Sequence, residues 1–555
     1  MTDQPGSGRS TPRGAHAPEG APRSPGGSPI LHPLAFALYP ILALLAANLQ
    51  ELDAAEAVRP LLLAVLAAVL LLGVLRLILG DWHRAGLATS VILLIFFSYG
   101  HVYTTLERLS PPGFSLGRHR YLLPISLALI AGLLAWLWRR RPDLRRGTIV
   151  LNVVGGALLL FPLATIATTV VRAAIQGQSF QPTETVRLSP AEDEPLPDIY
   201  YIILDSYARA DYMQGLFGYD NSEFIDFLES RGFYVADQSH ANHNWTGYSL
   251  SSSLNLEYVQ DLGLQLSPHS YPWVASPAIR DSLVRQALEQ AGYQSVALQT
   301  GWGVTEITDA DQYLVASEAE MRKQRRPIML TRFETQLVQT SMVLALSDLN
   351  QDSWERWTTE FGDLPYSELR TIVLSAFTNL PLAADDPRPQ FVFAHIMSPH
   401  KPFVFGPQGE PRDPTGAFTF ANTVGDSTEI PAYRDQAVFV TKQIELAIDE
   451  ILRTSEIPPI LILQADHGYP WGDDEWQSEP GRGVPQRTAI LNAYLLPQRC
   501  RSMLYPTITP VNTFRVVFNC QFGTSLAMLE DRIFYTLDPR QDPTDIVDVT
   551  DRVGP

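Results

Sequence analysis

Five long apolar stretches in the first 171 residues constrain the fold of this chain more than any other feature. Short loops separate the stretches, which cover residues 33–50, 59–80, 86–106, 120–138 and 148–171. Each has close to the ~20 residues that a helix needs to cross a bilayer. The sequence therefore predicts a bundle of about five transmembrane helices over residues 31–172. The first stretch is the weakest, because Pro40, Asn48 and Gln50 interrupt it.

The placement of arginine predicts the orientation of this bundle. The loop after the fourth stretch carries five arginines within residues 139–146, and the N-terminal tail carries three more. Because cytoplasmic loops are enriched in Lys and Arg, the N-terminus is expected inside. An odd number of spans then places the chain after residue 172 outside the cytoplasmic membrane. The loop after the third stretch, with Arg108, Arg118 and Arg120, is an exception that the five-arginine loop outweighs.

Composition divides the rest of the chain into a tail, a linker and a second domain. Residues 1–30 are rich in Gly, Pro, Ser and Arg, which predicts a disordered cytoplasmic tail. Residues 173–197 end in a segment of prolines and acidic residues, which is typical of a semi-stiff tether. Between residues 198 and 545, apolar runs of strand length alternate with helical patterns such as 221–230 and 434–453. This alternation predicts an α/β sheet with helices on both faces.

Charge differs sharply between the two halves of the chain. Residues 1–195 carry a formal net charge of +4, and residues 196–555 carry −22. Proteins that bind nucleic acid present a basic face to the phosphate backbone, so nucleic acid is excluded as a partner of the acidic half. The same charge argues against simple adsorption of the second domain onto an anionic membrane surface.

Two of the expected strands run directly into acidic residues. The strands are expected at residues 199–204, 295–299, 390–395, 460–464 and 489–496. Asp205 follows the first, and Asp466-His467-Gly468 comes one residue after the fourth. Ligands of open α/β sheets bind at the carboxyl ends of the strands. A lone acid at such a position is usually a cap or a turn residue, but two acids with an adjacent histidine are ordinary ligands for a divalent cation.

Four motifs in sequence order support a resemblance to a known family. They are Asp205, the threonine-containing segment 242–258, Ser398-Pro399-His400-Lys401-Pro402-Phe403, and Asp466-His467-Gly468. Together with the apolar stretches, they resemble the sulfatase-like branch of the alkaline phosphatase superfamily. The membrane-anchored phosphoglycerol and phosphoethanolamine transferases, a group that includes lipoteichoic acid synthase, are the most similar in layout. The resemblance spans about residues 33–540 and implies an alkaline phosphatase/sulfatase-like α/β sandwich outside the membrane.

The resemblance also implies roles for individual residues. Asp205, Thr246, Asp466 and His467 would hold one divalent metal ion. Thr246 would be the nucleophile, because metal coordination lowers the pKa of its hydroxyl and so activates it. His400, and with it His395, would bind the phosphoryl oxygens, and His400 would protonate the leaving group. Oxygen-rich ligation favours Mn²⁺ or Mg²⁺, and the imidazole also admits Zn²⁺.

Other interpretations of these residues stay open. Thr246 is a preferred residue type for the N-cap of the helix expected after it, and that role can coexist with catalysis. Ser249 is the alternative nucleophile. Four histidines near the motifs could instead be core or loop residues without a chemical role, namely His240, His243, His395 and His400.

Absent motifs narrow the chemistry further. The chain has no Cys or Ser in the setting that a formylglycine-type sulfatase requires, and its only cysteines are Cys500 and Cys520. Two-metal members of the superfamily need a late histidine, whereas the last histidine here is His467, so one metal is expected. The two cysteines lie in the external half, where a disulfide can persist. Their spacing alone does not decide whether they pair.

These observations predict a membrane-anchored, divalent-metal-dependent phosphotransferase or phosphodiesterase with a threonine nucleophile. The lipid bilayer is the expected partner, and a lipid-linked or polymer phosphate ester of the cell envelope is the expected substrate, because the anchor raises their local concentration. Two alternatives stay open: a hydrolase of phosphate or sulfate esters with water as acceptor, and a non-enzymatic membrane protein with a degenerate domain. The sequence does not predict the head group, the acceptor or the oligomeric state.

Overall fold

The chain is described from a computed structural model. The described residues are 29–49, 54–109, 118–176, 180–182, 185–189, 195–264, 266, 274–317, 331–348, 364–385, 388–412, 429–469, 483–539 and 542–553. All but two residues of the predicted N-terminal tail, and parts of the predicted tether, lie outside these ranges.

Helices form at all five predicted apolar stretches, and four of them are long and apolar enough to cross a membrane. The five helices are α1 (His32–Asn48), α2 (Val58–Leu79), α3 (Trp82–Arg108), α4 (His119–Arg140) and α5 (Arg145–Gln176). The count of about five spans is therefore slightly high, because α1 has 17 residues and a length of about 25 Å. Helix α5 continues into the predicted tether.

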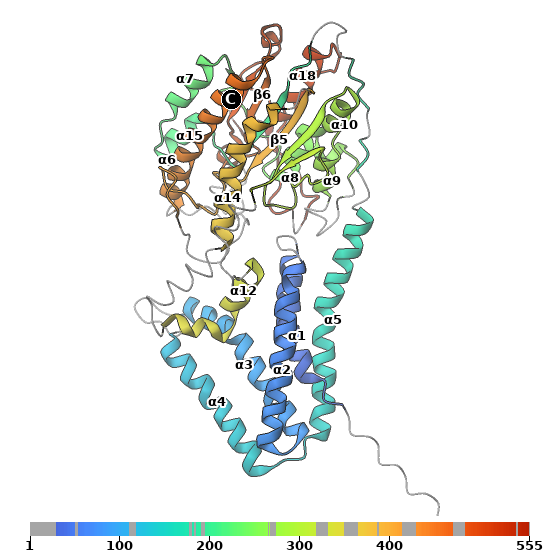
Figure 1. Ribbon diagram of the computed structural model, residues 1–555, viewed down its shortest axis with the longest axis vertical. Coiled ribbons are helices and arrows are strands. Elements are labelled where there is room, and N and C mark those ends of the chain that lie inside the picture. The colour runs from blue at the N-terminus through green and yellow to red at the C-terminus, as the bar shows by residue number, and fades with distance from the viewer. Residues whose placement is uncertain are drawn as a thin grey trace, which may run out of the picture.

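The exterior of these helices is strongly apolar. Large side chains on α2 and α5 are open to the surroundings, for example Leu62, Leu77 and Phe161, and Leu77 is 84% exposed. Apolar surface of this extent marks contact with a membrane or a partner rather than with water. Helix α1 instead packs against α2, α3 and α5, so it lies among the other helices of the bundle (Figure 1).

The second domain is built on a seven-stranded sheet in the order β2-β7-β6-β1-β5-β3-β4. The strands are β1 (Ile199–Leu204), β2 (Tyr234–Val235), β3 (Gln294–Leu298), β4 (Gln312–Leu314), β5 (Gln390–Ile396), β6 (Ile460–Gln464) and β7 (Asn492–Leu495). Strands β6, β1, β5, β3 and β4 are parallel, and β7 runs antiparallel to β6. Strand β1, which is fully buried, lies between β5 and β6. This arrangement puts the carboxyl ends of three neighbouring strands together.

Helices cover both faces of the sheet, as predicted (Figure 1). Successive residues of β1 point to opposite faces, and they divide between two hydrophobic clusters accordingly. One face packs on α6 (Ala210–Phe217), α7 (Ser222–Ser230), α14 (Leu364–Asn379) and α15 (Ile430–Thr454). The other packs on α8 (Thr246–Asn255), α9 (Ala275–Arg280), α10 (Leu283–Gln290) and α18 (Thr513–Gln521).

Smaller elements complete the second domain. A short helix, α17 (Val484–Thr488), precedes β7, and β8 (Phe534–Tyr535) pairs with β9 (Val547–Asp548) in a separate two-stranded sheet. Cys500 and Cys520 form a disulfide with a Cα–Cα distance of 5.5 Å, so the two cysteines do pair, which their spacing in the sequence did not decide.

One segment of the second domain returns to the membrane helices. It consists of α12 (Arg332–Thr340) and η3 (Met342–Asp348), which contact α3 (Figure 1). Phe333 is fully buried in a cluster with Ile41 and other residues of the bundle. Glu334 forms an ion pair with Arg59 on α2. This segment was not predicted, and it gives the second domain a contact with the bundle besides the covalent connection after α5.

Candidate metal centre at the carboxyl ends of three strands

The predicted acids and histidines converge at one edge of the sheet. Asp205 follows β1, His400 lies in the loop after β5, and Asp466 and His467 follow β6. Backbone hydrogen bonds hold the first two ends together, since Asp205 donates to Ile396 (3.0 Å) and His400 donates to the Asp205 carbonyl (3.0 Å). Strand order and parallel direction therefore bring together residues that are up to 262 positions apart in the sequence.

Ser206 ties the end of β1 to the end of β6. Its backbone N–H donates to Asp466 Oδ1 (3.0 Å), and its hydroxyl donates to the Gly468 carbonyl (3.0 Å). Its φ of 66° lies in the left-handed region, which a residue with a Cβ adopts at a cost and which is a form of strain that clusters at functional sites. No sequence pattern indicates this role of Ser206.

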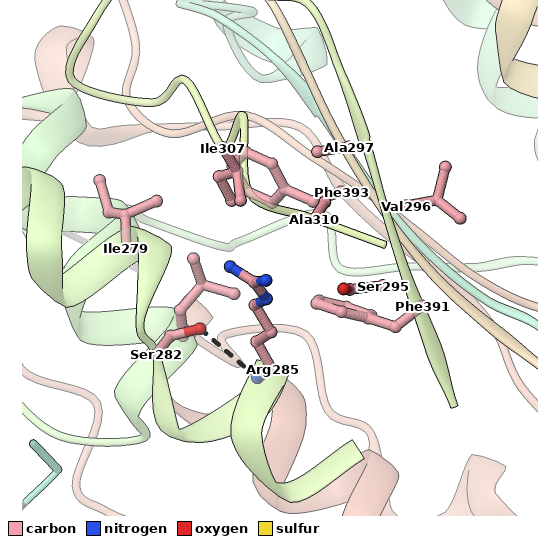
Figure 2. A pocket seen from close by; sticks show the side chains of 11 residues that line it. Ile279, Ser282, Arg285, Ser295, Val296, Ala297, Ile307, Ala310, Phe391 and Phe393 are labelled. Atoms are coloured by element: carbon pink, nitrogen blue, oxygen red, sulfur yellow. Dashed lines mark hydrogen bonds between the residues drawn. The ribbon is translucent and has the colours of Figure 1, made fainter. Parts of the chain in front are cut away.

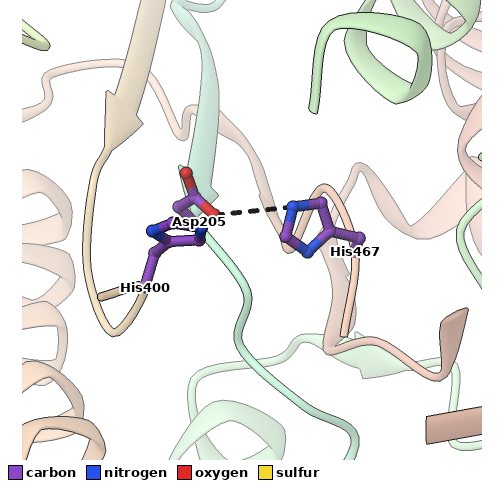
Figure 3. A group of neighbouring side chains, drawn as sticks. All are labelled: Asp205, His400 and His467. Atoms are coloured by element: carbon purple, nitrogen blue, oxygen red, sulfur yellow. Dashed lines mark ion pairs between the residues drawn. The ribbon is translucent and has the colours of Figure 1, made fainter. Parts of the chain in front are cut away.

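Two overlapping groups of three residues have the geometry to hold a metal ion. Asp205, His400 and His467 form one group, and Asp205, His395 and Asp466 form the other. Within each group, one ligand atom from each residue lies within 4.8 Å of the others. All five residues are buried. Figure 3 shows the first group, with the His467 ring turned toward the Asp205 carboxylate and His400 on the loop after β5.

Hydrogen bonds fix the three histidine rings. Nδ1 of His467 lies 2.9 Å from the Gly468 carbonyl, and Nδ1 of His400 lies 2.5 Å from the Lys401 carbonyl. A carbonyl oxygen only accepts, so both Nδ1 atoms carry the proton, and the Nε2 atom of a neutral ring is then a potential ligand. Nδ1 of His395 contacts the Thr305 hydroxyl (2.9 Å), and its Nε2 lies 3.3 Å from Asp205 Oδ2. Such contacts orient histidines that ligate metals.

The electrostatics of the group call for a cation. Nε2 of His467 lies 3.4 Å from Asp466 Oδ2 and 3.9 Å from Asp205 Oδ1. Both carboxylate oxygens are buried without a hydrogen-bond partner among the described residues. Burial raises the pKa of Asp205, but His400, His395 and His467 outweigh it and hold that pKa below its usual value. Burial, followed by the charge of Arg487, lowers the pKa of His467 to about 4, so its Nε2 presents a lone pair to two carboxylates.

Thr246 lies beside this group at the start of α8. Its Oγ1 is 3.2 Å from His467 Nε2, and the residue is 5% exposed. The N-cap of α8 is Trp245, which makes no side-chain cap hydrogen bond, so the interpretation of Thr246 as the cap is wrong. Helix N-termini attract negative charge, which suits an anion held next to this hydroxyl. Ser249, one turn further along α8, is fully buried, and its hydroxyl has no hydrogen-bond partner in the described part of the chain.

The remaining histidines of the motifs separate into two kinds. His395 is one of the five residues of the two groups that could hold a metal ion, together termed the metal-ligand group: Asp205, His395, His400, Asp466 and His467. His240 contacts the Thr488 hydroxyl (2.9 Å) and an Arg209 nitrogen (3.1 Å), which are structural contacts. His243 stacks on Phe534 at 5.3 Å, and burial lowers its pKa to about 3, so it is a neutral core residue.

Two features of the site were not predicted from the sequence. A Cβ at Gly468 would overlap the carbonyl oxygen of Gln486, so the Asp-His-Gly motif needs glycine for a close backbone approach. Arg487 on α17 is fully buried and donates from Nη1 to the Gly468 carbonyl (3.4 Å). No local pattern marks Arg487, because its contact with Gly468 exists only in the folded domain.

Two cavities of the second domain lie away from this group. One, of about 10 Å³, is bordered by α10 and β3 and is lined in part by Ser282, Arg285 and Phe393 (Figure 2). Its volume is close to the minimum for a single water molecule. The other, of about 480 Å³, is lined in part by Gln260 and Phe534. No lining residue of either cavity belongs to the metal-ligand group.

No family model and no curated protein matches the chain. Among solved structures, it is similar to the integral membrane protein lipooligosaccharide phosphoethanolamine transferase A (EptA) from Neisseria meningitidis, with 14% identity, a TM-score of 0.39, and coverage of 88% of this chain and 95% of that one. The C-terminal periplasmic domain of EcEptC from Escherichia coli, in complex with Zn, has 12% identity, a TM-score of 0.40, and coverage of 67% and 98%.

A sulfatase structure is also similar to the chain. BT1596, a 2-O GAG sulfatase, has 12% identity, a TM-score of 0.37, and coverage of 60% of this chain and 72% of that one. Phosphoethanolamine transferases and sulfatases, the classes that the sequence motifs resemble, are thus among the structures similar to this chain. Structural similarity with TM-scores this low does not assign a function to the chain. The function is therefore inferred from the geometry of the site.

Proposed function

We propose that the chain is a membrane-anchored, metal-dependent phosphotransferase or phosphodiesterase in which Thr246 is the nucleophile. One observation carries this proposal: two unpartnered carboxylate oxygens and the lone pair of His467 face one another beside the Thr246 hydroxyl. A buried group of this kind is electrostatically unfavourable unless a cation occupies it. A hydroxyl next to such a cation is suited to attack on a phosphate ester.

The ligands we propose are Asp205, Asp466, His467 and Thr246. One divalent ion bound there would act as a Lewis acid and lower the pKa of the Thr246 hydroxyl. The sequence favoured Mn²⁺ or Mg²⁺. The His467 imidazole among these ligands supports Mn²⁺ or Zn²⁺ over Mg²⁺, which prefers oxygen ligands and keeps several waters.

The proposed reaction has two steps. In the first, Thr246 Oγ1 loses its proton to solvent and attacks the phosphorus in line, so that an Oγ1–P bond forms and the P–O bond to the leaving alcohol breaks. His400 enters this step as an imidazolium and donates its Nε2 proton to the leaving oxygen, which leaves the ring neutral with its Nδ1 proton still on the Lys401 carbonyl. In the second step, an acceptor hydroxyl attacks the same phosphorus and gives its proton to His400, while the Oγ1–P bond breaks and Thr246 regains a proton from solvent.

The contacts of His395 support a positioning role for this residue in the reaction. Its Nε2 faces Asp205 Oδ2, and its other ring nitrogen is engaged by Thr305. It would therefore hold the Asp205 carboxylate in place, whereas the sequence suggested contact with substrate. His400, whose backbone is bonded to Asp205, remains the proposed contact to the leaving group.

A lipid-linked or other envelope phosphate ester is the proposed substrate. The segment of α12 and η3 contacts the membrane helices and so supports a site held near the bilayer. We place residues 139–146, which hold five arginines and join the end of α4 to the start of α5, on the cytoplasmic side, so that α5 leads the second domain to the outside. An N-terminus inside then requires α1 to cross as well.

Trapping of the phosphorylated threonine tests the proposal. The full chain in detergent, with Mn²⁺, is reacted with vesicles of phosphatidylethanolamine and phosphatidylglycerol, and the peptide that contains Thr246 is examined by mass spectrometry. We expect a phospho-head-group adduct on Thr246 that T246A lacks and S249A keeps. Release of free head group without transfer to a second lipid would identify the hydrolase alternative. Full metal-dependent turnover by T246A would refute the proposal that Thr246 is the nucleophile.

A further inference from the structure

Arg487 is a fully buried cation without a counter-ion among the described residues. Among the described residues, no carboxylate forms an ion pair with it, and its Nε and Nη2 atoms have no hydrogen-bond partner. Its remaining contacts are weak: Nη1 donates to the Gly468 carbonyl at 3.4 Å, and the guanidinium carbon lies 5.8 Å from the centre of the Trp245 ring. An unpaired buried guanidinium is unfavourable, so this arrangement calls for an anion.

Both contacts of Arg487 place it next to the reacting groups. The Gly468 carbonyl that it touches also anchors Nδ1 of His467. Trp245 immediately precedes Thr246, at the N-terminus of the ten-residue helix α8. The guanidinium therefore flanks the Thr246–His467 pair, and its charge adds to the positive end of the α8 dipole.

The two unpartnered atoms are chemically informative. Nε and Nη2 form one edge of the guanidinium, and their N–H bonds point in parallel. This edge matches two oxygens of one carboxylate or phosphoryl group and binds them bidentately. Nη1, on the other edge, is the atom engaged by Gly468, so one edge is held and the other has no hydrogen-bond partner in the described part of the chain.

We propose that Arg487 binds two non-bridging oxygens of the substrate phosphoryl group through Nε and Nη2. The inference rests on the proposed function and adds a residue that selects a tetrahedral oxyanion next to Thr246. In this arrangement a cation held by Asp205, Asp466 and His467 would neutralise one side of the phosphoryl group, and Arg487 and the α8 N-terminus would neutralise the other. Arg487 also remains available to the phosphorylated threonine, so it serves both steps.

Inorganic phosphate is the probe that tests this inference. Binding of phosphate to the full chain in detergent with Mn²⁺ is measured by calorimetry and by the rise in melting temperature. We expect R487M to bind phosphate at least tenfold more weakly than the wild type and to bind Mn²⁺ no more weakly, because it removes a positive charge next to His467. R487K keeps the charge but not the fork, and we expect it to fall between the two.

Arg515 provides a matched control. It is also a buried arginine, but its nitrogens donate to the Leu256 carbonyl (2.6 and 3.1 Å) and to the Ala527 carbonyl (2.5 Å). We expect R515M to lower the melting temperature without phosphate, because it leaves carbonyls unpaired, and to leave phosphate affinity unchanged. R487M without phosphate should melt no lower than the wild type, because it removes an unpaired charge.

Each outcome decides the inference. Phosphate affinity in R487M and R487K equal to that of the wild type would overturn it, as would a melting temperature of R487M as low as that of R515M. T246A separates the two proposals, since loss of turnover with intact phosphate binding supports both, and full turnover in T246A refutes only the nucleophile.

Discussion

Replacing Gly468 with alanine tests how the site depends on a close backbone approach. The added Cβ would overlap the carbonyl oxygen of Gln486 and come within 2.9 Å of the Ala489 carbonyl oxygen. Both are backbone atoms, so neither can rotate away, and the hydrogen bond from the Gly468 N–H to the Arg487 carbonyl (2.7 Å) must lengthen. Overpacking of this kind costs about 1–3 kcal/mol.

The same substitution should weaken metal binding. The Gly468 carbonyl orients His467 through Nδ1, and loss of such a supporting contact reduces metal affinity about 10–100-fold. The assays are differential scanning calorimetry of the metal-free protein and Mn²⁺ titration by calorimetry. We expect G468A to have a lower free energy of unfolding and weaker Mn²⁺ binding.

Gly303 is the control for this prediction. A Cβ added at this position would have no neighbouring atom within 4 Å, so G303A should change neither property. If G468A matched G303A in both stability and Mn²⁺ affinity, the tight contact of the Asp-His-Gly turn with α17 and Ala489 would not support the site. The reasoning from backbone approach to ligand orientation would then be wrong.

Three further predictions follow from contacts elsewhere. The folded protein lowers the pKa of His243 to about 3, so between pH 6.5 and 3 the unfolded state binds one more proton. Stability therefore falls as the pH is lowered through this range, by up to about 1.4 kcal/mol per pH unit. His467, whose pKa is lowered to about 4, contributes a slope of the same sign, so H243F should reduce the slope and not abolish it, as measured by urea unfolding at pH 7 and 5; an unchanged slope would contradict the prediction. E334A removes the ion pair with Arg59, so hydrogen exchange of residues 331–348 should accelerate; unchanged exchange would show that the contact with the bundle does not depend on this pair. Replacing Cys500 and Cys520 with serine removes the disulfide and should lower the free energy of unfolding by about 3 kcal/mol. Equal urea midpoints for the variant and the wild type would show that the disulfide does not stabilise the fold.

The strands that carry the ligands could be predicted from the sequence. The runs at residues 199–204 and 460–464 are continuously apolar because both faces of β1 and β6 are buried, and their bounds match the structure. The run at 489–496 shortens to Asn492–Leu495, because Ala489 and Ile490 instead form isolated bridges to His240 and Ala208. Apolar composition does not distinguish a paired strand from such bridges.

The ligand group itself was predictable only in part. Asp205 and Asp466 stand out because each follows a buried strand. The positions of His395 and His400 relative to Asp205 depend on β5 being the neighbour of β1, which local sequence does not specify. The contact of α12 with the membrane helices and the position of Arg487 also depend on how distant parts of the chain pack together. No local sequence pattern indicates them.

Anomalous diffraction from crystals of the full chain grown with Mn²⁺ tests the central claim most directly. We predict one strong peak per chain, bonded to Asp205, Asp466 and His467 at about 2.0–2.3 Å, with Thr246 Oγ1 as a further ligand. A peak bonded to other residues, or no peak among these four side chains at saturating Mn²⁺, would contradict the account.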